Sequence, residues 1–474
     1  MEQEASVQKP FILNKKRTFL IGFAFFGILL LWQVYDLSCS KFLEKLFMDA
    51  LGTNNSEDVQ YLVGVMMAID NIAALILLPI FGHLSDKTNT RIGKRMPYIL
   101  IGTFITSIAF PFIPVFFHLN NLVGVIIMMA VVVLFSMMYR NPAVALMPDM
   151  TPKPLRSKAN GIINIMGYIG GFVGTLFTMF FVISKYLGKA ENPGWQQGNI
   201  WAIELPFLLG SIFMVISALV LFIFIKENKI RDEVYDEMKR GEEYSEATDK
   251  KAASDDDSRI SKSNLITLLL ILTAEFFWFM ADNGIGTFLT NYVSSHLGQE
   301  TSLGSVLTIV GGVGSVIGFV VGGLIASKIT RKWTLISGLV ITIIGYVLWI
   351  VMTFSNIGVG GEGAPFWLYI VWALKGFGMS LVHVNSYPMV VELCSTKKIG
   401  RFTGYYYASS MTAQSVTPIL LGLLLLHPGI HWDVLPIYAG ACVLISIIIF
   451  LFVKNVKNTK TKFKKGLEAL DVDE

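Results

Sequence analysis

Apolar residues in this chain gather into long runs that are separated by short polar stretches. Twelve of these runs contain about 18 residues or more, which approaches the roughly 20 residues that a helix needs to cross a bilayer. Most of the lysine, arginine, aspartate and glutamate residues lie between the runs. The pattern predicts an all-α polytopic membrane protein with twelve transmembrane helices, over residues of about 18–38, 59–83, 97–117, 121–147, 161–184, 204–225, 264–293, 303–326, 333–354, 366–391, 403–426 and 434–453.

The composition agrees with this pattern and excludes several classes of protein. Of the 474 residues, 53% are hydrophobic and 15% are charged, whereas soluble globular proteins are about a quarter charged. A net charge of +4 gives no basis for nucleic-acid binding. The sequence contains no Walker A loop, Gly-x-Ser-x-Gly element, Cys/His metal-ligand spacing or dinucleotide-binding fingerprint. We therefore expect neither an enzyme nor a bound cofactor or metal, and we expect three free thiols, at Cys39, Cys394 and Cys442.

Basic residues predict how the chain is oriented, because cytoplasmic loops of membrane proteins are rich in lysine and arginine. If the N-terminus is cytoplasmic, the connections on the opposite side contain only Lys41, Lys45, Lys185 and Lys189. We therefore expect a multi-pass plasma-membrane protein with both termini in the cytoplasm. The predicted organisation is an N-tail (1–17), an N-terminal six-helix bundle (18–225), a charged cytoplasmic linker (226–262), a C-terminal six-helix bundle (263–454) and a C-tail (455–474).

The two predicted bundles repeat each other in sequence. The pattern Trp32-x-x-x-Asp36 recurs in the second half as Trp278-x-x-x-Asp282. Further along each half, at similar spacing, an acidic residue and a glycine bracket a short loop: Asp149 and Gly161 in the first, Glu392 and Gly404 in the second. Such a repeat predicts two pseudo-symmetric bundles with a solute site near mid-membrane at their interface.

Three stretches resemble a known group of transporters. Residues 82–97 read Gly-His-Leu-Ser-Asp-Lys-Thr-Asn-Thr-Arg-Ile-Gly-Lys-Arg-Met-Pro. They resemble the major facilitator superfamily signature in the form found in glycoside–pentoside–hexuronide:cation symporters. Residues 139–161, which begin Tyr-Arg-Asn-Pro, and residues 384–418, which begin Val-Asn-Ser-Tyr-Pro, resemble the sucrose-transporter-like branch. The resemblance implies a twelve-helix alternating-access fold and cation-coupled uptake of a sugar or glycoside.

The chain departs from these relatives at several positions. Sucrose transporters carry an arginine at the position of Val144, and many bacterial relatives carry a glutamate at the position of Gly286. The melibiose-type symporters have paired acidic residues in the second span, where this chain has Ala74 and Leu78. The resemblance therefore names neither the coupling ion nor the sugar.

Ionisable side chains inside the predicted spans are the first functional candidates, because each costs about 2.5–3.5 kcal/mol to insert. Asp36 and Asp282 each follow a tryptophan by four residues, so ring and carboxylate share one helix face. An aromatic ring suits the apolar face of a sugar, and a carboxylate suits its hydroxyl groups. We expect six residues to line the solute site: Trp32, Gln33, Asp36, Trp278, Asp282 and Asn283.

A second set of candidates could couple transport to a cation. Asp70 is a lone carboxyl in a span with Asn71 beside it, and a carboxyl in a low-dielectric environment can load and release a proton near neutral pH. Arg140 is a permanent cation that needs a carboxylate partner, for which Asp70 and Asp36 are candidates. Sodium would instead need converging oxygen ligands, which Asp70, Asn71 and Asp36 could supply. His383 could also titrate, and Glu275 could pair with Lys375.

Charged residues at the cytoplasmic ends of helices form a third set, whose role as a gate follows mainly from the resemblance: Asp86, Arg91, Lys94, Arg95, Asp149, Arg156 and Glu392. They could equally serve only to set the topology. The preferred function is proton-coupled symport of a sugar or glycoside by a monomer. The alternatives are sodium-coupled symport of another solute such as a lysolipid, and a membrane sensor that does not transport. The short cytoplasmic segments argue against the sensor.

Overall fold

The computed structural model describes residues 11–183, 200–252, 262–355, 365–393 and 399–454. Within these ranges the chain is helical without any β-strand, and twelve of its helices are long and apolar enough to cross a membrane. This is the expected form for long apolar segments, because a helix satisfies all of its backbone hydrogen bonds internally. The prediction of an all-α protein with twelve spans is confirmed.

The first six spans form the N-half of the molecule. Within it, α1 packs against α5 and α7, α3 packs against α4 and α7, and α2 packs against α4. The spans of the N-half are α1 (Lys15–Leu51), α2 (Gln60–Lys87), α3 (Met96–His118), α4 (Leu122–Asp149), α5 (Arg156–Phe180) and α7 (Trp201–Phe224). Short 3₁₀ turns precede α2 and α5, namely η1 (Ser56–Val59) and η2 (Lys153–Leu155).

The last six spans form the C-half and repeat the packing of the N-half. Here α10 packs against α14 and α15, α12 packs against α13 and α15, and α11 packs against α13. Each of these pairs has its counterpart among the first six spans, as a duplicated bundle requires. The spans are α10 (Lys262–Asn291), α11 (Ser302–Ile329), α12 (Arg331–Phe354), α13 (Phe366–Val391), α14 (Ile399–Leu425) and α15 (Val434–Leu451). A π-helical turn, η4 (Tyr292–His296), extends α10.

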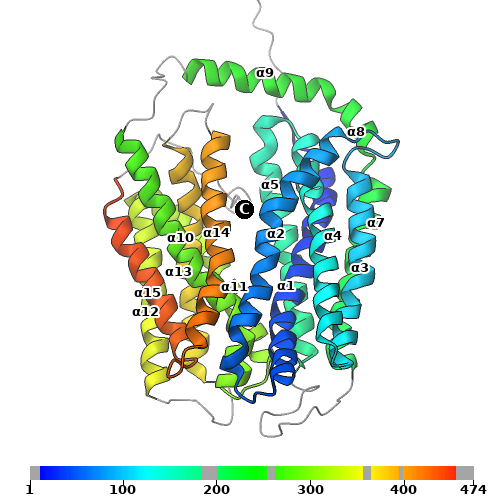
Figure 1. The fold of residues 1–474 in the computed structure, drawn as a ribbon. Helices are drawn as coiled ribbons and strands as arrows, with labels where there is room; N and C mark the ends of the chain where they lie inside the picture. The colour runs from blue at the N-terminus through cyan, green and yellow to red at the C-terminus, as the bar shows by residue number, and fades with distance from the viewer. Residues whose placement is uncertain (1–10, 184–199, 253–261, 356–364, 394–398, 455–474) are drawn as a thin grey trace, which may run out of the picture.

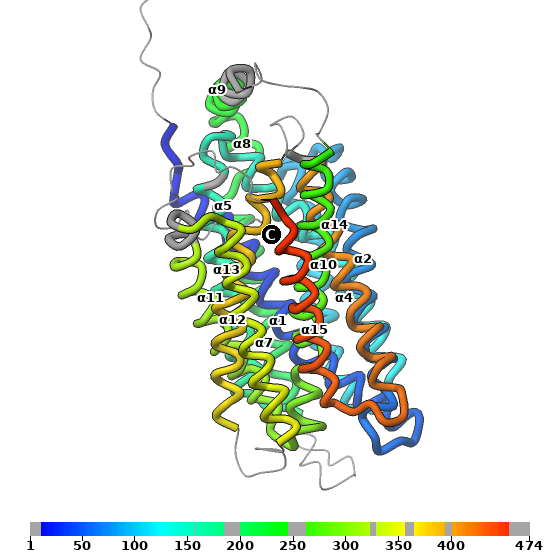
Figure 2. Tube along the Cα trace, turned by 90° about the vertical axis from the view of Figure 1, so that its left-hand side faces the viewer, coloured from blue at the N-terminus to red at the C-terminus, as the bar shows by residue number. Residues whose placement is uncertain are grey.

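Two further helices lie outside the spans, at one end of the bundle (Figures 1 and 2). They are α8 (Glu227–Glu233) and α9 (Tyr235–Ala252), which belong to the segment that joins the two halves. We call this end the linker end, and we call the opposite end, which carries η1 and the α14–α15 turn, the distal end. The two tails, in part or whole, and Cys394 lie outside the described residues, whereas Cys39 and Cys442 are buried free thiols.

Three helix pairs join the halves to each other: α2 with α14, α5 with α11, and α1 with α10. Figure 1 shows α2 and α14 approaching each other toward the distal end and diverging toward the linker end. The close approach needs glycine. A Cβ atom added at Gly64 of α2 would lie 2.1 Å from the Pro418 carbonyl oxygen, and one added at Gly422 of α14 would lie 2.6 Å from the Gln60 carbonyl oxygen.

Candidate functional site

Three polar or aromatic residues in the central part of α1 are not buried. From Leu30 to Glu44 every residue is buried except Trp32, Gln33 and Asp36, and Asp36 is the most exposed of them. Because α1 packs against α4, α5 and α7 of the N-half and against α10 of the C-half, it lies at the boundary between the two halves.

The corresponding part of α10 also has three residues that are not buried. From Met280 to Val293 every residue is buried except Asp282, Asn283 and Gly286. Five of the six residues expected to line the solute site therefore lie at open positions of the two central helices. Trp278 is different: it is 0% exposed and packs against Phe450 of α15. The expectation that it shares an open face with Asp282 fails because α15 covers that side of α10.

The other N-half residues of this group pack beside Asp36. The ring of Trp32 meets Tyr35 edge-on, with the centroids 5.4 Å apart. Gln33 lies against α5, where a Cβ atom added at Gly174 would come within 3.1 Å of the Gln33 Cβ. In the described part of the chain, the indole nitrogen of Trp32 and the amide oxygen of Asn283 are buried without hydrogen-bond partners.

Three charged residues of the N-half interact with one another across α1, α2 and α4. Arg140 interacts electrostatically with both Asp36 and Asp70, and the two carboxyl groups also interact. Asp70 is 7% exposed, and its Oδ1 accepts a hydrogen bond from the backbone N–H of Asn71 at 2.6 Å. No close ion pair joins these three side chains where the structure describes them. Asp36 and Asp70 are thus the carboxyl groups that interact with Arg140, as expected, although neither of these described side chains forms a close ion pair with it.

The C-half carries a different arrangement at its centre. Lys375 of α13 forms an ion pair with Asp282 of α10, with Nζ 2.6 Å from Oδ1. Both residues also interact electrostatically with His383, whose ring lies 5.3 Å from that of Phe279. The expected pair between Lys375 and Glu275 does not form, because the Asp282 carboxylate takes the ammonium group.

Glu275 lies apart from this group. It is 0% exposed on α10, and in the described ranges neither of its carboxylate oxygens has a hydrogen-bond partner. An ionised carboxylate without partners is costly inside a protein. Glu275 is therefore placed to hold a proton, and it lies three residues before Trp278 and not among the open positions.

Arg95 is the hub of the charged residues at the linker end. It precedes α3, is 5% exposed, and donates to Asp149 Oδ2 at 2.9 Å, to Ser85 Oγ at 2.5 Å and to Asp86. Lys94 Nζ also lies 3.0 Å from Asp149. Burial opposes the charged form of Arg95, but Asp149 and Asp86 outweigh it and raise the pKa of the guanidinium. These contacts tie α2, α3 and α4 together within the N-half.

The linker segment reinforces this cluster from outside. Glu227 of α8 is 2% exposed, and its carboxylate accepts hydrogen bonds from the backbone N–H groups of Lys94, Arg95 and Met96 at 2.9–3.2 Å. These are the unpaired donors at the N-terminus of α3, where a carboxylate is also favoured by the helix dipole. No local sequence pattern singles out Glu227, because its partner atoms are backbone groups 131 to 133 residues away.

The remaining gate candidates divide between the halves. Arg156 donates to the carbonyl oxygens of Thr151 and Pro148 at 3.1 and 3.0 Å, so it covers the end of α4. Arg91 is exposed. In the C-half, Glu392 at the end of α13 pairs with Arg331 at the start of α12, at 3.0 Å. This pair is the counterpart of Asp149 with Arg95, and the repeat could have identified Arg331.

At the distal end a buried polar network joins the two halves, and none of its residues was predicted. Lys41 and Glu44 of α1, which are 8% and 1% exposed, lie 2.5 Å apart. Ser295 of η4 bonds to both, at 2.8 Å from Lys41 Nζ and 2.6 Å from Glu44 Oε1. Gln60 donates to Glu44 at 3.1 Å and accepts from Asn291 at 3.1 Å. The signal in the sequence was the pair of charges just beyond the first predicted span.

A second cross-half contact lies beside this network. The carboxylate of Glu57 in η1 accepts a hydrogen bond from the backbone N–H of Trp432 at 2.9 Å, and its other oxygen lies 2.8 Å from His431 Nδ1. Ser56 Oγ accepts from the Trp432 indole at 3.0 Å. The hydrogen bond with Glu57 raises the pKa of His431. These contacts hold the distal end closed.

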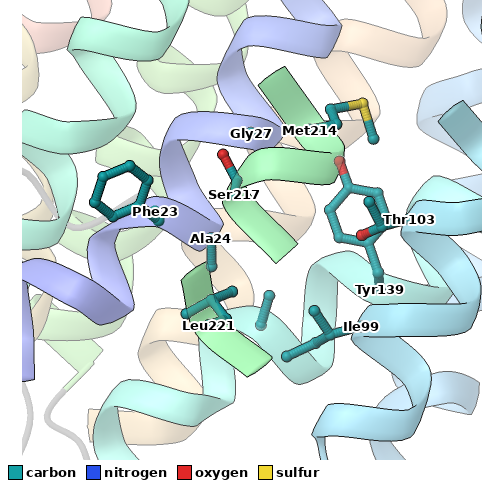
Figure 3. Close-up of a pocket in the computed structure, with 10 residues that line it drawn as sticks. Phe23, Ala24, Gly27, Ile99, Thr103, Tyr139, Met214, Ser217 and Leu221 are labelled. Carbon is teal, nitrogen blue, oxygen red and sulfur yellow. The ribbon is translucent and has the colours of Figure 1, made fainter. Parts of the chain in front are cut away.

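A small cavity lies inside the N-half, among α1, α3, α4 and α7 (Figure 3). Its volume is about 10 Å³, and it is lined mostly by apolar groups. The Tyr139 hydroxyl beside it has no hydrogen-bond partner in the described part of the chain. A space of this size holds about one water molecule, so it is too small to be the solute site.

Comparisons with known proteins agree with this architecture. The chain is 29% identical over 183 residues to the sucrose transport protein SUC3 of Arabidopsis thaliana, which covers 33% of the chain and 29% of that protein. It is 24% identical over 345 residues to the lactose permease of Lactobacillus helveticus, which covers 69% of the chain and 49% of that protein. The aligned region therefore spans less than half the length of each of these curated relatives.

Solved structures show the same fold at low sequence identity. A D-xylose–proton symporter superimposes with a TM-score of 0.66 at 16% identity, covering 94% of this chain and 99% of the other. A family model described as "MFS/sugar transport protein" matches residues 28–426, which is most of the chain. The chain belongs to this family of the major facilitator superfamily, which is a family of membrane transporters and not of enzymes.

Proposed function

We propose that the protein is a symporter that carries a sugar or glycoside together with one monovalent cation, most simply a proton, by alternating access. The family description and the names of the sucrose and lactose relatives support a sugar as the solute. The cytoplasmic linker end, the plasma membrane as location, the division into two six-helix domains and the monomeric state belong to the same proposal.

The observation that carries the coupling is the charge at the centre of the N-half. Asp36 and Asp70 would together contribute two negative charges and Arg140 one positive charge, which leaves one negative charge uncompensated. Enclosing a net charge in a low-dielectric space is expensive. Binding one proton or one sodium ion removes this charge, whereas the Asp282–Lys375 pair of the C-half is neutral already. A single cation therefore permits the enclosed state.

The transport cycle follows from the two ends of the molecule. The distal end is held by the Lys41–Glu44–Ser295 contacts and by Glu57, while α2 and α14 diverge toward the linker end (Figure 1). In this state a solute on Asp36 would be released toward the linker end. Loading from the other side requires these distal contacts to break, so that the halves rock about the central site.

The test uses de-energised cells that overproduce the protein in weakly buffered medium. Disaccharides and glycosides are added singly while external pH is recorded. Prompt alkalinisation with one sugar, abolished by a protonophore, is the expected result. The same uptake driven by a sodium gradient without a pH change would replace the proton by sodium. Uptake of a lysolipid without any response to sugars would refute the sugar assignment.

Two variants connect the result to the site. Asp70→Asn should abolish pH-driven accumulation while leaving sugar exchange across the membrane measurable. Asp58→Asn is the matched control, because Asp58 is an exposed carboxylate of η1 at the distal end. Full pH-driven accumulation by Asp70→Asn would show that this carboxyl does not carry the coupling. Expression and folding of both variants are checked by gel filtration in detergent.

A further inference from the structure

Gly286 occupies an unusual position on α10. A Cβ atom added there would meet no atom within 4 Å, although the residue lies in the middle of the molecule. Its neighbours Ile285 and Thr287 are 1% and 8% exposed, so the helix itself is enclosed. The empty space at Gly286 is therefore confined to this position, and the rest of α10 around it is closely packed.

The surroundings of Gly286 identify this opening as part of the solute space. Asp282 precedes Gly286 by four residues, so both lie on one face of the helix. Thr290 follows by four residues on the same face, and its Oγ1 donates to the Leu37 carbonyl oxygen at 3.1 Å. Leu37 is the neighbour of Asp36. Gly286 thus lies between the Asp282–Lys375 pair and the contact that closes α10 against α1.

The chemistry of the open positions excludes a lipid-facing interpretation. Between Met280 and Val293 the residues that are not buried are Asp282, Asn283 and Gly286. A surface that faces lipid instead exposes large apolar side chains, as the α11 residues Val313 and Val316 do, at 58% and 59% exposed. The unburied positions on this stretch of α10 are therefore two polar residues and a glycine, which suits a space that holds water or a sugar.

We propose that Gly286 determines the size of the solute, by leaving room for a second ring next to the one bound at Asp36 and Asp282. The solute class then extends beyond monosaccharides, which need only the first ring position, to disaccharides and to glycosides with a bulky aglycone. This inference rests on the proposed function, because it assumes that the solute is a sugar. Larger side chains at position 286 would fill the space of the second ring while leaving the first ring in place.

The chain offers a matched control at Gly312. A Cβ atom added there also meets nothing within 4 Å, but Gly312 lies on the exposed face of α11 beside Val313 and Val316. Gly286→Leu and Gly312→Leu therefore add the same atoms to a helix at an open position. They differ in whether the position faces the space between the halves or the surface of the bundle.

The first experiment measures uptake of a monosaccharide and a disaccharide by the wild-type protein and by the two leucine variants. Gly286→Leu should lower kcat/KM for the disaccharide by about tenfold or more and leave the monosaccharide within about twofold, while Gly312→Leu changes neither. Equal loss for both sugars, or no loss, would overturn the inference. Absence of uptake of any sugar by the wild-type protein would refute the proposed function.

A second experiment does not depend on knowing the solute. Gly286→Cys and Gly312→Cys are treated in membranes with a water-soluble maleimide, with the wild-type protein as the blank for its own cysteines. The inference requires Gly286→Cys to be labelled at least about tenfold faster than Gly312→Cys, because thiolates react only where water reaches them. Failure of Gly286→Cys to label would show that the position is closed to water, and would overturn the inference even if sugar uptake is normal.

Discussion

Ser295 offers a direct way to loosen the distal end without disturbing either half. Its hydroxyl group bonds to Lys41 and Glu44 across the interface, at 2.8 and 2.6 Å. The Lys41–Glu44 pair itself lies within α1 and would remain. Ser295→Ala therefore removes two cross-half hydrogen bonds and keeps the buried charges paired.

The size of the effect follows from the kind of bond that is lost. Hydrogen bonds to charged groups contribute about 1.5–3 kcal/mol each. Because Ser295 is only half-buried, water would replace part of this, and the lower value is appropriate for each bond. The total of about 3 kcal/mol corresponds to roughly a 100-fold change in an equilibrium constant. A transporter that is about 99% closed at its distal end would then be about half closed.

The assay is a distance measurement between spin labels on the two halves. Asn54 lies just before η1 and His427 lies just after α14, and both are exposed, so cysteines at these positions report the opening of the distal end. Ser294→Ala is the control, because the Ser294 hydroxyl bonds only to the Asn291 carbonyl oxygen of its own helix among the described contacts. We expect a second, longer distance in Ser295→Ala and not in Ser294→Ala. Identical distance distributions in the two variants would refute the reasoning.

Three further predictions concern pH and ion pairs. Because Glu57 raises the pKa of His431, the stabilisation of the closed distal end by this contact is complete below the usual histidine pKa of about 6.5 and is lost as the pH rises through the raised pKa. The same spin labels should therefore report more opening at alkaline pH, and His431→Gln should flatten this dependence. Arg95→Ala should cost about 3 kcal/mol of stability, because it removes a buried partner of Asp149, whereas Arg91→Ala at an exposed position should cost almost nothing. Thermal unfolding in detergent measures the difference, and equal unfolding midpoints for the two variants would contradict the central place of Arg95. Lys375→Met and Asp282→Asn should each destabilise the protein more than the double variant does, with a coupling energy between the two substitutions of about 1–3 kcal/mol. If the losses of stability in the two single variants add up to the loss in the double variant, the 2.6 Å contact between Lys375 and Asp282 carries no net energy.

The fold could be predicted from the sequence because the membrane restricts the possibilities. Every apolar run had to become a helix, and the repeat of Trp-x-x-x-Asp indicated that the second half copies the first. The residues at the open positions could be predicted in part for the same reason. Asp36 and Asp282 cannot face lipid cheaply, so they had to face the interior or a water-filled space.

The contacts that join distant helices could not be predicted in this way. Whether Lys375 pairs with Glu275 or with Asp282 depends on how α13 is rotated against α10, and both acidic residues lie within seven positions of each other. Trp278 shows the same limitation, since only the position of α15 decides that its ring is covered. Glu227 and Ser295 bind through backbone atoms or through partners more than 130 residues away, which leaves no local pattern.

The repeat also explains how the two halves can share a scaffold and still have different roles. At the linker end they carry equivalent ion pairs, Arg95 with Asp149 and Arg331 with Glu392, with nitrogen–oxygen distances of 2.9 and 3.0 Å. These pairs join the same helix positions in both bundles, so they belong to the shared scaffold. At the centre the halves differ, because Asp282 has its own cation at 2.6 Å whereas Asp36 and Asp70 share Arg140. A scaffold that is common to both halves and a charge that is balanced in only one of them would, under the proposed function, place the sensitivity to the cation in the N-half. Under the proposed function, the C-half then contributes shape to the site, through Asp282 and the open space at Gly286.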